Sequence, residues 1–162
     1  MIAKIKQIIF IILIMLTTNI TAQDIINGAN QMNRYISLLE NKNIAIVANQ
    51  TSMINSTHLV DSLLTKKIKI IKVFSPEHGF RGNADAGEIV ENSIDKKTKI
   101  PIVSLYGENK KPSKEQLNNI DIIIFDIQDV GARFYTYIST LHYVMEAASE
   151  NKIKLIILDR PN

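Results

Sequence analysis

Three side chains that can carry acid or base chemistry lie within five positions, at Glu77, His78 and Arg81. They follow the apolar, β-branched run 68–74, which predicts a strand, so they come at that strand's carboxyl end. In an open α/β sheet, the loops that leave these ends line the ligand crevice. A carboxyl group beside apolar residues can serve as a general acid near neutral pH, which makes Glu77 the candidate for that role. The alternative interpretation is a salt-bridged surface loop.

A second dense group of polar side chains follows the apolar run 122–125, which also predicts a strand. It contains Gln128, Asp129, Arg133 and Tyr135. Amide, carboxylate, guanidinium and phenol groups together can bind a hydroxyl-rich ligand through hydrogen bonds and aromatic contacts. The alternative is an ordinary helix start in which Arg133 pairs with Asp129. The density of polar groups favours a ligand-binding role.

Two further carboxylates, Asp85 and Glu88, lie in the long stretch 79–101, which has little periodicity. One of them could stand opposite Glu77, since glycoside hydrolysis typically needs two carboxyl groups about 5–9.5 Å apart. The alternative is that both are solvated loop acids. No dinucleotide or phosphate-loop pattern and no metal-ligand spacing occurs in the sequence, so we expect no cofactor and no metal.

The elements that must position these groups alternate between strand and helix. Apolar runs predict strands at 44–48, 68–74, 102–106, 120–126 and 153–158. Spacings of three and four predict helices at 25–40, 57–67 and 137–151, and a capping-box pattern predicts a short helix at 113–118. Alternation of this kind predicts a mostly parallel sheet with right-handed crossovers.

The first 22 residues have the pattern of a secretory signal peptide. Lys4 and Lys6 precede nine apolar residues, 8–16, and a polar stretch ends at Ala22, where we expect cleavage. A retained anchor is the alternative, but the apolar run is shorter than the roughly 20 residues that span a bilayer. Cleavage would leave residues 23–162 with a net charge of +1 instead of +3, which gives no electrostatic argument for nucleic acid. The chain has no Cys, so no disulfide can form.

The chain resembles a bacterial family that was long catalogued as a domain of unknown function and is associated with exo-β-N-acetylmuramidases. The resemblance covers about 44–162 and is carried by FSPEHGFRG at 74–82, DAGE at 85–88, PIVSLYG at 101–107, DIQDVGARFYTY at 126–137 and LDRPN at 158–162. Five motifs in the same order are far more specific than any one alone. The resemblance implies a Rossmann-like, three-layer α/β domain over 23–162, followed in full-length relatives by a second domain, absent here, that completes a cleft.

The resemblance also implies a function. Family members release N-acetylmuramic acid from the non-reducing ends of peptidoglycan fragments, and the glutamate of the SPEHG motif, here Glu77, is the favoured catalytic residue. We expect His78 to act beside it. From their positions, the expected substrate contacts are Arg81, Glu88, Gln128, Asp129, Arg133 and Tyr135.

The first functional hypothesis is therefore an exported exo-glycosidase, periplasmic or extracellular in a bacterium, with weak or no activity in the absence of the second domain. The second is a non-catalytic periplasmic module that binds cell-wall sugars. A nucleotide-binding protein is disfavoured, because the phosphate-binding loop is missing. Peptidoglycan-derived sugars are the expected partners, without nucleic acid or a stable membrane anchor after cleavage, and the oligomeric state is left open.

Overall fold

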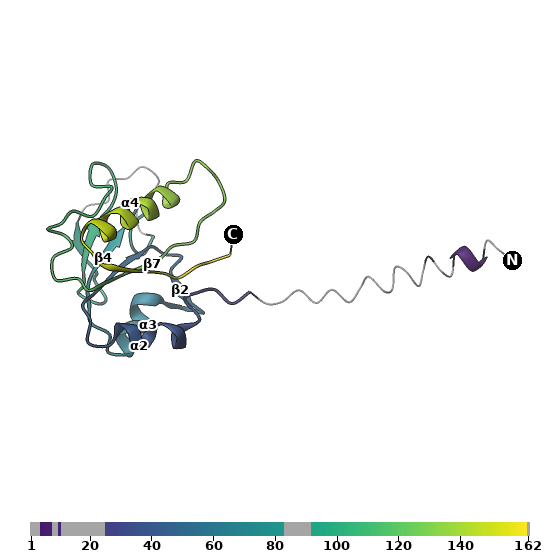
Figure 1. Cartoon of the computed structure of the whole chain (residues 1–162), viewed down its shortest axis with the longest axis horizontal. Coiled ribbons are helices and arrows are strands. Elements are labelled where there is room, and N and C mark those ends of the chain that lie inside the picture. The colour runs from purple at the N-terminus through teal and green to yellow at the C-terminus, as the bar shows by residue number, and fades with distance from the viewer. Residues whose placement is uncertain (1–3, 8–9, 11–24, 83–91, 162) are drawn as a thin grey trace.

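The computed structural model describes residues 4–7, 10, 25–82 and 92–161, and its centre is a mostly parallel sheet (Figure 1). In the described part of the chain this sheet has six strands in the order β5-β6-β4-β1-β7-β8, parallel except for the β5–β6 pair. The strands are β1 (Ile44–Ala48), β4 (Ile70–Ser75), β5 (Ser93–Ile94), β6 (Pro101–Ser104), β7 (Ile122–Asp126) and β8 (Lys154–Ile157).

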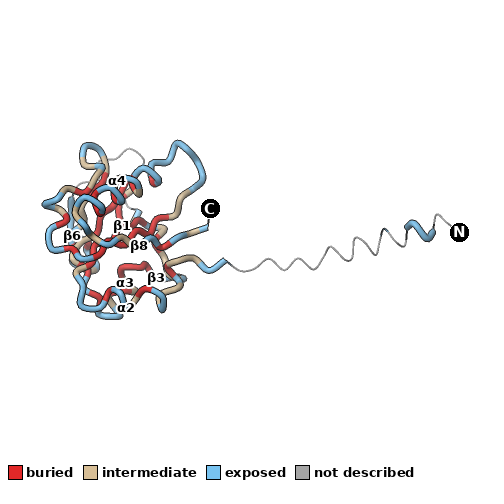
Figure 2. The backbone as a smooth tube through the Cα atoms, viewed as in Figure 1, coloured by how far each residue is buried: buried red, intermediate tan, exposed pale blue. Residues whose placement is uncertain are grey.

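Helices cover the sheet on both faces. The short helices η1 (Met32–Arg34) and α2 (Ile36–Leu39) lie with α3 (Leu59–Thr65) on one face, and α4 (Tyr137–Glu150) lies on the other (Figure 1). Alternate residues of β1 enter two separate cores, Ile46 on the α3 side and Val47 on the α4 side. Strands β1 and β7 are therefore buried along their whole length, as their unbroken apolar sequences predict (Figure 2). The predicted three-layer, Rossmann-like α/β fold is confirmed.

The predicted helix at 25–40 is wrong in its first half. Residues 28–30 form a turn, and helical structure is limited to η1 and α2. The reason is a tertiary contact, since the Gly28 N–H donates to the Asp159 carbonyl at 2.6 Å. A Cβ at Gly28 would lie 2.6 Å from the Asp159 nitrogen, so the close approach of the two backbones requires glycine here. The Tyr35 hydroxyl then donates to the Ala29 carbonyl and closes the segment.

Two local elements differ from the sequence prediction. The predicted helix at 57–67 begins only at Leu59, because a small hairpin of β2 (Met53–Ile54) and β3 (Thr57–His58) precedes it. The predicted helix at 113–118 is a series of turns, although the capping-box hydrogen bonds between Ser113 and Gln116 do form. Both segments are short, and tertiary contacts outweigh weak helical preference at such lengths.

The described residues contain no helix that is long and apolar enough to cross a membrane.

Candidate active site

The carboxyl ends of the central strands meet at one edge of the sheet. Strand β1 lies between β4 and β7, with Val47 paired to Phe74 on one side and to Phe125 on the other. From β1 the chain first adds strands on one side, β4 and then β6, and later adds β7 and β8 on the other side. The direction in which strands are added therefore reverses beside β1. Ligands bind at such a reversal point in open α/β sheets. The loops after these three strands are therefore the place to look for a site.

Glu77 follows β4 in a tight turn. The Gly79 N–H donates to the Pro76 carbonyl at 3.2 Å, and His78 and Gly79 both have left-handed backbone, with φ of 69° and 75°. The hydroxyl of Tyr106 donates to Oε1 of Glu77 at 3.2 Å. The negative charge of Glu77 raises the pKa of Tyr106, and burial and this hydrogen bond raise it further. Glu77 and His78 are both partly exposed at the edge of the sheet.

Two side chains that the sequence analysis did not name as site residues, Tyr137 and Asn49, connect to the group around Glu77. Tyr137, the first residue of α4, has a raised pKa, mainly because it is buried; the Asn49 amide lowers this pKa and the Glu77 charge raises it. Asn49 follows β1 and is fully buried, and its Oδ1 accepts from the backbone N–H and hydroxyl of Thr51 at 2.9 and 2.6 Å. Among the described residues its Nδ2 has no hydrogen-bond partner, although the amide lies near enough to the Tyr137 phenol to lower the pKa of that phenol.

Arg81, expected to contact substrate, is held by two carboxylates. Its guanidinium donates to Asp61 on α3 at 3.1 and 3.3 Å and to Asp95 at 2.9 and 2.8 Å. The pKa of Asp95 is held well below its usual range by the Arg81 guanidinium, despite the opposing effect of burial. Lys97 also pairs with Asp61 at 2.7 Å. This network favours a role for Arg81 in holding the 79–82 turn against α3.

The loop after β7 places its polar groups in different ways. Gln128 donates from Nε2 to the Pro161 carbonyl at 2.8 Å, and its N–H donates to the Thr51 hydroxyl at 3.1 Å. Asp129 accepts from the N–H of Gly131 at 3.2 Å. Tyr135 lies 6.2 Å, between ring centroids, from Tyr137, which connects it to the group around Glu77.

The remaining expected contacts are less tightly placed. Arg133 is exposed on the same loop as Tyr135. Glu88, like Asp85, lies outside the described residues. The structure thus brings Tyr135 toward Glu77 through Tyr137, places Arg81 in an ion-pair network, and leaves Gln128 joining three segments.

A buried ion pair supports the same edge of the sheet. Asp126 at the end of β7 is fully buried, and its carboxylate accepts from Nε and Nη2 of Arg160 at 2.6 and 2.9 Å. Arg160 also donates to the Met53 carbonyl at 2.9 Å. Burial raises the pKa of Asp126, and Arg160 opposes this effect. The Ser52 hydroxyl donates to the Asp126 carbonyl, so the pair ties β7 to the loops after β1 and β8.

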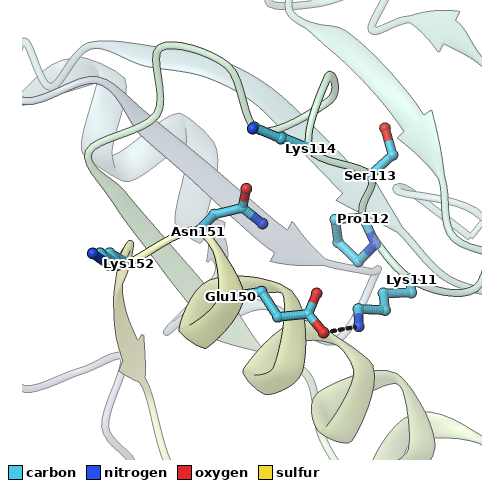
Figure 3. Close-up of a pocket in the computed structure, with 7 residues that line it drawn as sticks. All are labelled: Lys111, Pro112, Ser113, Lys114, Glu150, Asn151 and Lys152. Carbon is cyan, nitrogen blue, oxygen red and sulfur yellow. Dashed lines mark hydrogen bonds and ion pairs between the residues drawn. The ribbon is translucent and has the colours of Figure 1, made fainter.

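Two hollows lie at opposite ends of β8. A small cavity of about 140 Å³ is lined by Asp129, Tyr137 and Arg160, among others, at the carboxyl ends of β7 and β8. A larger, open hollow of about 560 Å³ lies at the amino end of β8, where α4 ends (Figure 3). There Lys111 is paired with Glu150 at 2.7 Å. The smaller cavity is the one that adjoins the candidate site.

Comparison with known proteins assigns the family. The model of the family described as "Exo-beta-N-acetylmuramidase NamZ, N-terminal" matches residues 44–162. The chain belongs to this family. The match includes all of the site residues described above, from Asn49 after β1 to Arg160 after β8. The Gly28 turn lies before the matched region.

Relatives of known structure and name support this assignment. The chain is 49% identical over 130 residues to the peptidoglycan beta-N-acetylmuramidase NamZ of Bacillus subtilis, covering 79% of this chain and 31% of that protein. It is similar to crystal structures of two DUF1343 family proteins from Bacteroides fragilis. The match to the first structure has a TM-score of 0.74 and 46% identity, and it covers 86% of this chain and 36% of the solved chain. The match to the second structure has a TM-score of 0.75 and 37% identity, and it covers 84% of this chain and 34% of the solved chain. The chain therefore spans about a third of the length of these relatives.

Among the described residues at the carboxyl ends of the strands, Glu77 is the carboxylate that accepts a hydrogen bond from a tyrosine hydroxyl. Of the other acids described near this edge, Asp126, Asp61 and Asp95 are engaged by arginines, and Asp129 accepts from the Gly131 N–H.

Proposed function

We propose that this NamZ-family chain is part of an exo-acting glycoside hydrolase that releases N-acetylmuramic acid from the non-reducing ends of peptidoglycan fragments. Family membership and the 49% identity to a relative named for this activity support the substrate class. The observation that carries the proposal for this chain is the placement of Glu77 at the carboxyl end of β4, within hydrogen-bond distance of Tyr106.

In the proposed reaction, protonated Glu77 gives its proton to the leaving glycosidic oxygen as an oxocarbenium-like transition state forms. The loop after β7 would bind the sugar. Arg133 is the better-placed guanidinium for the lactyl carboxylate, because Arg81 already binds two aspartates. A guanidinium binds a carboxylate through two parallel hydrogen bonds, which gives orientation as well as charge. His78 beside Glu77 would orient or tune it.

The test is turnover of a chromogenic N-acetylmuramic acid β-glycoside by the purified full chain and by Glu77→Gln. We expect the substitution to lower kcat by at least about 100-fold, the range for loss of a general acid. Glu108→Gln is the matched control, since Glu108 is exposed on the loop after Tyr106. Circular dichroism checks that both variants fold. Unchanged turnover in Glu77→Gln would contradict the assignment of the proton donor.

The alternative hypothesis from the sequence is a non-catalytic module that binds cell-wall sugars. Saturable binding of N-acetylmuramic acid without turnover by the wild-type chain would support this second function over the first.

We also propose that the protein is exported and cleaved after Ala22, on the basis of Lys4, Lys6 and the apolar run 8–16. Mass spectrometry of the protein from the periplasm or culture medium should then give a chain beginning at Gln23. A product that retains Met1 would contradict cleavage.

A further inference from the structure

Tyr106 is held beside Glu77 by an extension of the parallel sheet. Strands β4 and β6 are paired up to Ser75 and Ser104, and the Leu105 N–H donates to the Ser75 carbonyl at 2.8 Å, one step beyond the paired strands. Tyr106 follows Leu105 directly, two residues after the end of β6, and Glu77 lies two residues after Ser75. The backbone ladder therefore determines the separation of the phenol and the carboxylate, which do not meet merely as two flexible surface side chains.

The segment that carries Tyr106 is itself well anchored. The Tyr106 N–H donates to the Ser104 hydroxyl at 3.3 Å, and Asn109 Nδ2 donates to the Ser104 carbonyl at 2.5 Å. Gly107 then turns the chain with a left-handed φ of 68°. These contacts hold the backbone of Tyr106 on both sides, so its hydroxyl has a defined position relative to β4.

We propose that Tyr106 is a positioning residue for Glu77: its hydroxyl donates to Oε1, so that Oε2 is the oxygen that carries the proton and faces the ligand. A protonated carboxyl group has one acceptor oxygen and one hydroxyl oxygen. An oxygen that already accepts from a phenol is the acceptor, and the proton resides on the other. This inference rests on the proposed function, since it specifies which oxygen of Glu77 delivers the proton.

Positioning of this kind matters because proton transfer needs the donor within hydrogen-bond reach of the reacting oxygen. A glutamate side chain has three rotatable bonds, and a fixed contact at one oxygen restricts the place of the other. Of the described residues, the other titratable groups near Glu77 are Tyr137 from α4, whose pKa is raised mainly by burial and further by the Glu77 charge, and the adjacent His78. Among them, Tyr106 is the one with a hydrogen bond to the carboxylate.

The test compares Tyr106→Phe with the control Tyr143→Phe in the full chain. Tyr143 is partly buried on α4, where its ring contacts His142, so its substitution also removes one phenol hydroxyl. The first measurement is the set of three-bond α–β proton couplings of Glu77 by NMR, which report its χ1 rotamer. We expect one dominant rotamer in the wild type and in Tyr143→Phe, and averaged couplings in Tyr106→Phe. Unchanged couplings in Tyr106→Phe would overturn the proposal.

The second measurement is the phenol titration of Tyr106 in the wild type and in Glu77→Gln. Because the Glu77 charge is the largest cause that raises the Tyr106 pKa, removing the charge should lower this pKa. No change would show that the two groups do not meet in solution, and would also overturn the proposal.

The third measurement separates positioning from binding. In Tyr106→Phe we expect kcat for the chromogenic glycoside to fall about 10- to 100-fold, with KM within about twofold, because a misplaced reacting group slows chemistry without removing a substrate contact. A kcat equal to that of Tyr143→Phe would overturn the proposal. Absence of turnover in the wild type would instead count against the proposed function, and the two NMR measurements would still decide whether Tyr106 positions Glu77.

Discussion

Replacing Arg160 with Leu should destabilise the domain more than any exposed charge substitution. Asp126 is fully buried, and the Arg160 side chain is 7% exposed. The substitution removes two hydrogen bonds to the carboxylate and one to the Met53 carbonyl. Removing one partner of a buried ion pair typically costs about 3–5 kcal/mol, because the other charge stays buried without compensation. That is a large part of the roughly 5–15 kcal/mol that stabilises a typical domain.

The loss should depend on pH in a defined direction. The pKa of Asp126 is already raised by burial, and Arg160 opposes the rise, so the pKa should rise further in Arg160→Leu. A carboxyl whose folded pKa lies above its unfolded value costs stability as pH rises through the folded pKa. The deficit of the variant should therefore be greatest at neutral pH and shrink as the pH falls and Asp126 takes up a proton.

Urea denaturation followed by circular dichroism at pH 7 and pH 5 measures both effects. Arg34→Leu is the control, because Arg34 is an exposed arginine on η1. The double variant Asp126→Leu/Arg160→Leu should recover much of the loss, since it leaves no buried charge. A loss below about 1 kcal/mol in Arg160→Leu, or a double variant as unstable as the single one, would refute the argument that the buried charge is the cause.

Two further stability predictions follow from other contacts. Asp95→Asn should cost about 1–3 kcal/mol at pH 7, the range for hydrogen bonds to charged groups. Arg81 is the main cause that lowers the pKa of Asp95, so the stability that Asp95 contributes is present above the unfolded pKa and is lost as pH falls below about 4. The free energy of unfolding from urea melts should therefore fall less steeply with decreasing pH in the variant than in the wild type. Gly28→Ala should cost about 1–3 kcal/mol by thermal or urea melting, because its Cβ would meet the backbone of Leu158 and Asp159; an unchanged midpoint would show that the two segments separate easily.

The parts of the fold that the sequence predicted are those with long, consistent patterns. The apolar runs 44–48 and 122–126 became the two central strands, and the spacing in 137–151 became α4. The helix at 25–40 had the right spacing but is interrupted by a backbone contact to Asp159, 131 positions away from Gly28. Two-residue strands such as β2, β3 and β5 leave no recognisable period, so the sequence carries no signal for them.

The site was partly readable for a similar reason. Glu77 could be found because it follows a strand pattern directly. Tyr106 ends a predicted strand and gave a signal of the same kind, but its contact with Glu77 depends on β6 lying next to β4, which the order of elements does not determine. The pairing of Asp126 with Arg160 likewise depends on β7 and β8 being neighbours. The ion pairs of Arg81 could not be foreseen, because its partners Asp61 and Asp95 lie 20 and 14 positions away.

The hydrogen bond between Gly28 and Asp159 also has a consequence for engineering. Because the Gly28 and Asp159 backbones are in contact, a linker of a few residues could connect them in a chain limited to residues 28–159, and new termini could be opened at the exposed Lys66–Lys67 turn after α3. Such a circular permutant would keep the strand order of the sheet while changing which strand is made first. The residues around Glu77 would keep their places in the fold although the strands are synthesised in a different order. The order of folding could therefore be varied without altering the site.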